Sequence, residues 1–212
     1  MKKILVVDFG SQYTQLIARR LRELSVYSEV CPWDEIPVLD DVEGFILSGG
    51  PESSNIEGNP TINSLIFNTN KPILGICYGM QVLAHQEDGQ IINEGKKEFG
   101  YAKINIKADT VLFKNMSDSS DVWMSHGDKV ESLPDGYAIT ATSDNSPIAA
   151  YENTSKKYFG LQFHPEVTHT ENGTAIIKNF LNICGIEQNW SSDDILQQID
   201  AVVAAEVKNE EV

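Results

Sequence analysis

The sequence predicts an α/β protein with a mixed, mostly parallel central sheet, helices on both faces of that sheet and an antiparallel extension. Short apolar runs alternate with helical spacings up to about residue 84, as in proteins whose sheet strands are buried on both faces. After about residue 100, strand-like segments follow one another, which indicates antiparallel pairing. The 212 residues, 41% of them apolar, suffice for one compact domain with a full core.

The first strand and helix show this alternation most clearly. Ile4-Leu5-Val6-Val7 is apolar throughout and ends at Asp8, as in a strand buried on both faces. Residues 11–24 then carry apolar side chains at helical spacing, with arginines between them, which predicts a helix packed on the sheet. The same pattern predicts strands at 26–30, 44–47 and 73–76, and helices at 61–67 and 80–84. Such units predict parallel strands joined by helices.

The second half of the chain contains more strand-like segments, at 101–106, 137–142, 148–151 and 158–163. A helix is predicted at 174–183, and Gly185 would end it, because glycine readily adopts the left-handed conformation that closes many helices. Another helix is predicted after Trp190, where a serine cap and early acidic residues precede an apolar face. We therefore expect one domain over 1–186 and a C-terminal helical extension or linker over 187–212.

The composition argues against two classes of partner. The formal charge of -15 leaves no surplus of Lys and Arg with which to bind the phosphates of nucleic acids. The apolar run near the start stops at Asp8, and no later stretch approaches the length of a membrane span. The three cysteines are too few and too scattered for a disulfide framework. These features predict a cytoplasmic protein that binds neither nucleic acid nor membrane.

Cys77 is the candidate nucleophile. Gly75-Ile76-Cys77-Tyr78-Gly79 lies between an apolar strand and a helix, which is the context of a nucleophile elbow, a tight turn with a strained central residue. The flanking glycines leave room for the turn, and a helix N-terminus favours thiolate over thiol. The alternative is a small buried apolar residue. We keep that interpretation for Cys31 and Cys184, which lack such a context.

His164 and Glu166 are the candidate partners of this cysteine. A thiolate that attacks an amide needs a proton carrier for the leaving nitrogen, and histidine suits that task. His164 ends a predicted strand, where open α/β sheets place their active sites. Pro165 favours an extended backbone, in which residues 164 and 166 share a face. Glu166 can then orient one imidazole nitrogen and leave the other aimed at Cys77.

A metal site is the alternative for this segment, with His164, Glu166 and His169 as ligands. Pro165 argues against it, because proline excludes the helical spacing of zinc ligands. We therefore expect no metal in this chain. Of the other histidines, His85 falls within a predicted helix, where a structural role is more common.

A glycine-containing loop supplies further candidates for substrate binding. It consists of Ser125-His126-Gly127-Asp128. We expect Ser125, His126 and Gly127 to contact substrate, in part through backbone groups.

Backbone N–H groups should stabilise the negative charge that grows on the carbonyl oxygen during attack, each by roughly 10²- to 10³-fold in rate. The N–H of Tyr78, directly after the nucleophile, is one candidate donor. Gly50 is the other, because it lies in the glycine-rich loop 47–51 after a predicted strand, and a side chain there would hinder the approach of substrate. A purely structural turn is the alternative for this loop.

Together these segments resemble the class I, or triad, glutamine amidotransferases. The resemblance covers most of residues 4–184 and implies a flavodoxin-like fold. It is carried by the loop 48–51, the elbow and its continuation to Gln81, and Phe163-His164-Pro165-Glu166. Within the family, residues 8–13, 125–128 and 167–170 resemble the glutaminase portion of GMP synthetases.

The resemblance implies a covalent mechanism with L-glutamine as substrate. Cys77 would form a γ-glutamyl thioester and release ammonia, and water activated by His164 would then hydrolyse the thioester. Gln81 would help to hold the glutamine. Ammonia would pass to an ATP pyrophosphatase domain or subunit, the synthetase, which would convert xanthosine monophosphate to GMP with ATP and Mg²⁺. We expect no cofactor in this chain itself, and the segment from about 187 would lead toward that absent domain.

Three other functions are alternatives to this one. They are the glutaminase component of another complex such as anthranilate synthase, a γ-glutamyl hydrolase, and a non-catalytic module of the same fold. The presence of Cys77, His164 and Glu166 argues against the last. One departure from the family pattern is Gln86-Glu87-Asp88-Gly89, where relatives commonly have a Leu-Gly-Gly type of turn, and it predicts altered packing at the exit of the elbow helix.

Overall fold

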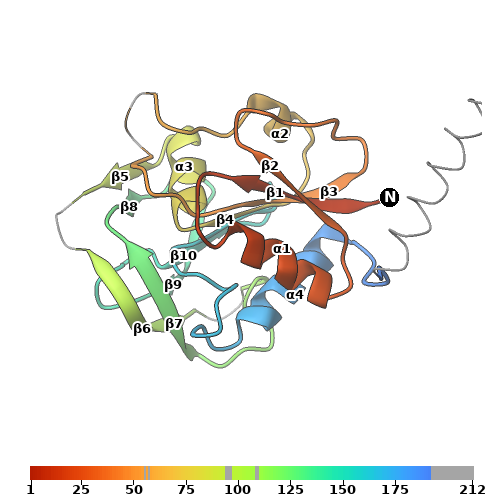
Figure 1. Cartoon of the computed structure of the whole chain (residues 1–212). Helices are drawn as coiled ribbons and strands as arrows, with labels where there is room; N and C mark the ends of the chain where they lie inside the picture. Colours follow the sequence, from red (N-terminus) through yellow and green to blue (C-terminus); the bar gives the residue numbers. More distant parts are fainter. Residues whose placement is uncertain (55, 57, 94–96, 108–109, 192–212) are drawn as a thin grey trace, which may run out of the picture.

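The computed structural model describes residues 1–54, 56, 58–93, 97–107 and 110–191 of the chain. The strands of its central sheet are β1 (Lys3–Asp8), β2 (Ser28–Pro32), β3 (Val42–Leu47), β4 (Ile73–Ile76), β6 (Glu98–Ile106), β7 (Ser119–His126), β9 (Ala138–Thr142), β10 (Ala150–Asn153) and β11 (Tyr158–Leu161). Their order is β2-β1-β3-β4-β11-β10-β9-β6-β7 (Figure 1). Neighbours from β2 to β11 are parallel, and those from β11 to β7 are antiparallel. The predicted fold class is confirmed.

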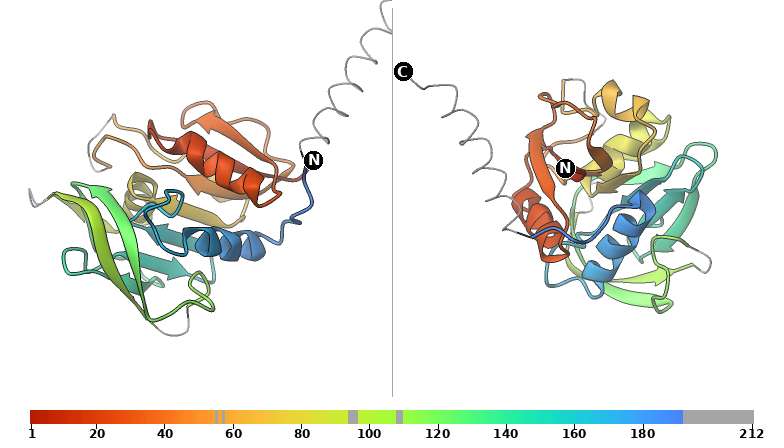
Figure 2. Two further views of the ribbon diagram at one scale, coloured as in Figure 1. Left: turned by 60° about the horizontal axis from the view of Figure 1, so that its bottom comes forward. Right: turned by 90° about the vertical axis from the view of Figure 1, so that its right-hand side faces the viewer.

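Helices cover both faces of the parallel part of the sheet. On one side lie α1 (Thr14–Glu23) and α4 (Gly173–Cys184), and on the other lie α2 (Ser64–Asn68) and α3 (Tyr78–Gln86) (Figures 1 and 2). Because successive strand residues point to opposite faces, Ile4 and Val6 of β1 pack with α1 and α4, whereas Leu5 and Val7 pack with α2 and α3. This two-sided burial explains the apolar run by which the first strand was predicted.

Three strands were not predicted. A separate two-stranded sheet consists of β5 (Gln90–Ile92) and β8 (Lys129–Ser132). The third is β7, which buries Ser120, Val122, Met124 and His126 on one face. Polar residues at both ends of this buried row hide the alternation that signals a strand. The interpretation of residues 125–128 as a loop was therefore wrong in part, since Ser125 and His126 end β7.

Strand β7 contacts the segment that follows β11. Met124 of β7 makes an isolated antiparallel bridge with Phe163, and the backbone N–H of His164 donates to the carbonyl of Trp123 at 3.0 Å. This contact carries residues 125–128 to the C-terminal ends of β4 and β11, where the predicted catalytic residues lie. The antiparallel half of the sheet thus supplies one wall of the site.

The C-terminal part of the described chain returns to the start of the domain. Helix α4 ends at Gly185, which has the left-handed conformation with φ 67°, as predicted. The backbone N–H of Trp190 then donates to the carbonyl of Ser25 at 2.9 Å, and its ring lies 6.0 Å from that of Tyr27. The helix predicted after Trp190 lies outside the described residues. Within those residues, no helix combines the length and apolar character needed to cross a bilayer.

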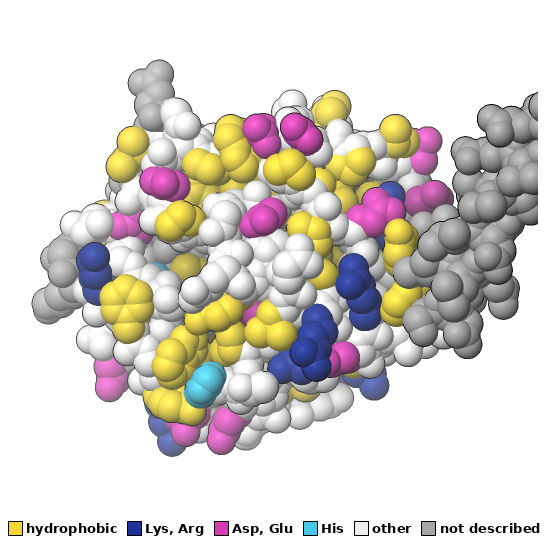
Figure 3. Space-filling model, viewed as in Figure 1, with side chains coloured by type: hydrophobic (Ala, Val, Ile, Leu, Met, Phe, Trp, Pro, Cys, Tyr) yellow, Lys and Arg dark blue, Asp and Glu magenta, His cyan; other side chains and the backbone are white. Residues whose placement is uncertain are grey.

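The surface in Figure 3 carries two distinct groups of side chains. Basic side chains gather over α1, which contributes Arg19, Arg20 and Arg22. Apolar side chains gather over the β6–β7 hairpin, where Phe99 and Tyr101 are both more than two-thirds exposed, at 67% and 69%.

Candidate active site

Cys77 lies at the centre of a strained turn between β4 and α3. Its φ of 53° and ψ of -106° are unfavourable for an L-residue, and it is the N-cap residue of α3. A Cβ atom at Gly75 would lie 2.5 Å from the carbonyl oxygen of Gly79, and one at Gly79 would meet the carbonyl oxygen of Leu47. The predicted need for two glycines in this elbow is therefore confirmed.

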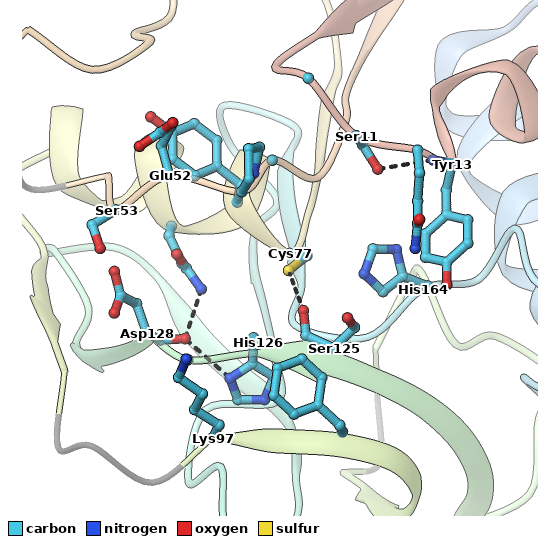
Figure 4. A pocket seen from close by; sticks show the side chains of 18 of the residues that line it. Ser11, Tyr13, Glu52, Ser53, Cys77, Lys97, Ser125, His126, Asp128 and His164 are labelled. Atoms are coloured by element: carbon cyan, nitrogen blue, oxygen red, sulfur yellow. Dashed lines mark hydrogen bonds between the residues drawn. The ribbon is translucent and has the colours of Figure 1, made fainter.

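The sulfur of Cys77 contacts two groups besides the histidine. Its thiol donates to the backbone carbonyl of Ser125 at 3.5 Å, and the side-chain amide of Gln162 donates to the sulfur at 3.8 Å. Figure 4 shows the sulfur beside the ring of His164 and above the carbonyl of Ser125, and Cys77 lines the cavity. The candidate nucleophile thus has hydrogen-bond partners on the β7 side and on the β11 side.

His164 and Glu166 form the predicted pair, although by a different backbone route. The Nδ1 atom of His164 lies 2.7 Å from the Oε1 atom of Glu166, and both side chains are buried. The extended backbone expected for this segment was wrong, because β11 ends at Leu161 and residues 165–166 form a turn. The turn nevertheless brings the carboxylate to one imidazole nitrogen and leaves Nε2 for the cysteine.

Electrostatics favours the protonated form of His164. Burial disfavours the imidazolium ion, but the charge of Glu166 and hydrogen bonds with Cys77 and Glu166 outweigh burial and raise the pKa of His164 well above its ordinary value. These interactions favour the imidazolium form, which carries the proton that an amide nitrogen would need in order to leave.

The surroundings of His164 keep the ring in place. The ring of Tyr13 packs edge-on against the imidazole of His164, with 5.1 Å between the ring centroids. The hydroxyl of Thr170 donates to the backbone carbonyl of His164 at 2.6 Å. A Cβ atom at Gly49 would lie 3.2 Å from its Cε1 atom. Sequence reasoning assigned no positioning role to Tyr13 or Gly49, since only the folded chain brings them to His164.

The two predicted oxyanion donors lie on one side of the cavity. Gly50 follows β3 and Tyr78 begins α3, and both line the cavity together with Cys77. A Cβ atom at position 50 would lie 2.7 Å from the carbonyl oxygen of Phe9. Close packing against the turn after β1 therefore requires this glycine.

The cavity beside Cys77 has a volume of about 500 Å³, and every predicted site residue except Glu166 lines it. Gln81 is buried in its wall, where its amide nitrogen donates to the carbonyl of Asp128 at 2.7 Å. The Oδ1 atom of Asp128 accepts from Asn93 at 2.6 Å, whereas Oδ2 is buried and has no hydrogen-bond partner among the described residues. Sequence reasoning did not assign Asp128 a role.

Both ring nitrogens of His126 have partners within the protein. Nδ1 lies 3.0 Å from the carbonyl of Asp128, and Nε2 lies 3.1 Å from the carboxylate of Glu98. Burial lowers the pKa of His126 despite the opposing charge of Glu98. The ring therefore braces the backbone of residues 126–128, and contacts from this segment to a substrate would come from backbone groups.

The remaining cysteines and histidines do not line the cavity. Burial raises the pKa of Cys31 to about 11 and also raises that of Cys184, so both thiols stay protonated. His85 is exposed on α3, and the ring of His169 packs against Trp123, with centroids 4.6 Å apart. The described residues contain no group of three or more metal-ligating side chains.

Sequence comparison relates the chain to one enzyme family. The family described as Glutamine amidotransferase class-I matches residues 5–184. A GMP synthase (glutamine-hydrolyzing) from Vibrio vulnificus is 45% identical over 215 aligned residues, which cover 100% of this chain and 42% of that protein. One from Aliivibrio fischeri is 46% identical, with the same coverage of 100% and 42%. The chain thus spans less than half the length of these curated relatives.

Solved structures give a consistent result. A Thermoplasma acidophilum protein, provisionally named as one of the subunits of a GMP synthase, has a TM-score of 0.75 and 31% identity, covering 93% of this chain and 98% of that chain. A glutamine amidotransferase from Thermotoga maritima has a TM-score of 0.66 at 21% identity, covering 85% of this chain and 81% of that chain. The second similarity concerns the fold alone.

Proposed function

Because the chain belongs to the class I glutamine amidotransferases, we propose that it hydrolyses the side-chain amide of L-glutamine. Cys77 is the nucleophile, His164 the general acid and base, and Glu166 the residue that orients His164. The contact of 2.7 Å between His164 and Glu166, made at the strand ends where the Cys77 sulfur lines the cavity, is the observation that carries this proposal.

The first half of the reaction releases ammonia. The thiolate of Cys77 attacks the carboxamide carbon, and negative charge moves to the carbonyl oxygen, where the N–H groups of Gly50 and Tyr78 stabilise it. As the carbon–nitrogen bond breaks, His164 gives its proton to the leaving nitrogen, so ammonia departs and a γ-glutamyl thioester remains. The raised pKa of His164 supports this role, because the proton donor must be charged before it acts.

The second half regenerates the enzyme. His164 is now neutral and takes a proton from water, and the resulting hydroxide attacks the thioester carbon. The carbon–sulfur bond breaks to give glutamate and the thiolate of Cys77. Glu166 keeps the imidazole in one orientation through both steps.

The α-ammonium group of glutamine is bound by acceptors at the other side of the cavity. The amide nitrogen of Gln81 faces Asp128, so its oxygen is the atom left to accept from substrate. The unpaired Oδ2 atom of Asp128 supplies a negative charge beside it. A buried carboxylate oxygen without a partner is costly, and an ammonium group would satisfy it.

Replacing Asp128 with asparagine should raise KM for glutamine by about 10- to 100-fold, with a smaller change in kcat. A hydrogen bond to a charged group contributes about this much, and the amino group lies away from the reacting carbon. Steady-state ammonia release measures both constants. Asp135→Asn, at an exposed position, is the matched control and should leave KM unchanged. A wild-type KM in Asp128→Asn would remove Asp128 from the substrate site.

The ammonia serves a synthetase domain or subunit that converts xanthosine monophosphate to GMP with ATP and Mg²⁺. Support comes from the names of the relatives and from the 42% of their length that this chain matches. We propose that 187–212 form the extension that leads toward this synthetase. The three free cysteines suit the reducing cytoplasm, where we place the reaction.

Three measurements test the proposed function. Incubation with glutamine should release ammonia, and a glutamine-like electrophile should label Cys77 in a peptide mass map. Addition of the synthetase part of a GMP synthase from one of these relatives should then give glutamine-dependent GMP formation. Ammonia release without any GMP would limit the activity to glutamine hydrolysis and contradict the assignment to a GMP-forming synthetase. The absence of both ammonia release and labelling would refute the proposal.

A further inference from the structure

Gln162 is a buried residue of the site to which sequence reasoning assigned no role. It follows β11 and is 0% exposed, and its backbone N–H donates to the carbonyl of Ala149 at 2.9 Å, which fixes the main chain. Its amide nitrogen lies 3.8 Å from the sulfur of Cys77. The effect of this buried amide on the sulfur depends on which of its atoms lies nearer. The nitrogen would donate a hydrogen bond to the sulfur, whereas the oxygen would repel a thiolate.

Neighbouring groups determine which end of the Gln162 amide faces the sulfur. The backbone carbonyl of Asp128 can only accept, so the group of Gln81 that lies 2.7 Å from it must be the amide nitrogen. The same nitrogen lies 3.3 Å from Gln162 and can only donate, so it must face the oxygen of Gln162. The nitrogen of Gln162 is therefore the atom that faces Cys77.

We propose that Gln162 is a catalytic residue that stabilises the thiolate of Cys77 by donating an amide hydrogen bond to its sulfur. The inference rests on the proposed function, in which Cys77 is the nucleophile. A chain of amides from Asp128 through Gln81 sets the orientation of Gln162, and this chain links the substrate pocket to the sulfur. When the oxygen of Gln81 accepts from a bound ammonium group, its N–H groups become better donors, which strengthens the chain.

The other groups around the sulfur act on it differently from the amide of Gln162. The carbonyl of Ser125 accepts from the thiol at 3.5 Å, so it favours the protonated form, whereas the amide of Gln162 favours the thiolate. The charged or titratable groups that line the cavity together with the sulfur are His164, His126, Asp128, Glu52, Lys97, Tyr13 and Tyr78, and Glu166 lies behind His164. The amide of Gln162 is uncharged, so its hydrogen bond to the sulfur persists whatever the protonation states of these groups.

Two substitutions separate this role from simple packing. Gln162→Met removes the donor at similar volume, and Gln162→Glu keeps an acceptor for Gln81 but places an oxygen beside the sulfur. The rate of alkylation of Cys77 by iodoacetamide, followed by peptide mass mapping across pH, should reach half its maximum at higher pH in both variants. We expect a move of about one pH unit for Gln162→Met and a larger one for Gln162→Glu, since a carboxylate repels the thiolate. In glutamine hydrolysis, kcat should fall about tenfold in Gln162→Met, with a smaller change in KM.

Gln86→Met is the matched control. Gln86 also makes two side-chain hydrogen bonds, both to the backbone of Ile62, and it does not line the cavity. Its variant should keep the wild-type alkylation profile, and thermal melting should show that all variants are folded. A folded Gln162→Met whose profile overlays that of the wild type overturns the proposal. Because alkylation needs no glutamine, this result is independent of whether the chain proves to be a glutaminase.

Discussion

Cys77→Ala should reduce glutamine hydrolysis by about 10⁴-fold or more, because no thioester can form without the sulfur. The domain should remain folded. The substitution removes one buried atom and leaves the backbone of the elbow unchanged, and alanine needs no more room than cysteine. Ammonia release under saturating glutamine gives the rate, and thermal melting gives the stability.

Substitution of the other two cysteines provides the control for this result. Cys31 is buried beside β1, and Cys184 lies where a Cβ atom at Gly44 would meet its sulfur. Cys31→Ala and Cys184→Ala should lower stability, because each removes packed volume, and should keep the activity. Undiminished ammonia release by Cys77→Ala, or labelling of the wild type at Cys31 or Cys184 alone, would contradict the assignment of the nucleophile.

His164→Gln should reduce kcat/KM by about 10³- to 10⁴-fold, and Glu166→Gln should reduce it less. The glutamine at position 164 cannot carry a proton to the leaving nitrogen. At position 166, however, the amide oxygen can still accept a hydrogen bond from the imidazole and keep part of its orientation. Equal losses in the two variants would contradict this division of roles.

The pH dependence of Glu166→Gln gives a second measurement of the same pair. The negative charge of Glu166 raises the pKa of His164, so an uncharged amide should lower that pKa. The imidazolium then loses its proton at a lower pH, and the basic limb of the profile of kcat/KM against pH should move to lower pH. An unchanged basic limb would mean that another group controls it.

The parallel half of the fold could be predicted from local signals. Its strands are buried on both faces, so runs such as Ile4-Leu5-Val6-Val7 contain no polar residue, and α1 keeps a clear apolar stripe. The antiparallel half gives weaker signals. In β7, the buried positions include Ser120 and His126, which are polar and find their partners only in the folded protein.

The same difference explains which parts of the site could be predicted. Cys77 and the pair His164 and Glu166 lie in short motifs, a glycine-flanked turn and a histidine two residues before a carboxylate. The motifs indicate the partners, although the backbone at residues 165–166 is a turn and not the expected extended segment. The contacts of Asp128 depend instead on the bridge between Met124 and Phe163. The contact of Gln162 with Cys77 depends on the pairing of β4 with β11, which also joins segments far apart in the sequence. No local pattern encodes these contacts, so the roles of Asp128 and Gln162 required the structure.

The strained backbone at position 77 lowers the stability of the folded protein, although the residue there carries the sulfur that the reaction needs. A conformation that costs an L-residue about 1–3 kcal/mol would be relaxed by glycine, which would also remove the sulfur. Natural selection for thermal resistance alone would thus favour a substitution that ends turnover. The residue persists only while the reaction itself is selected, and the rest of the core must compensate for the stability that it lacks.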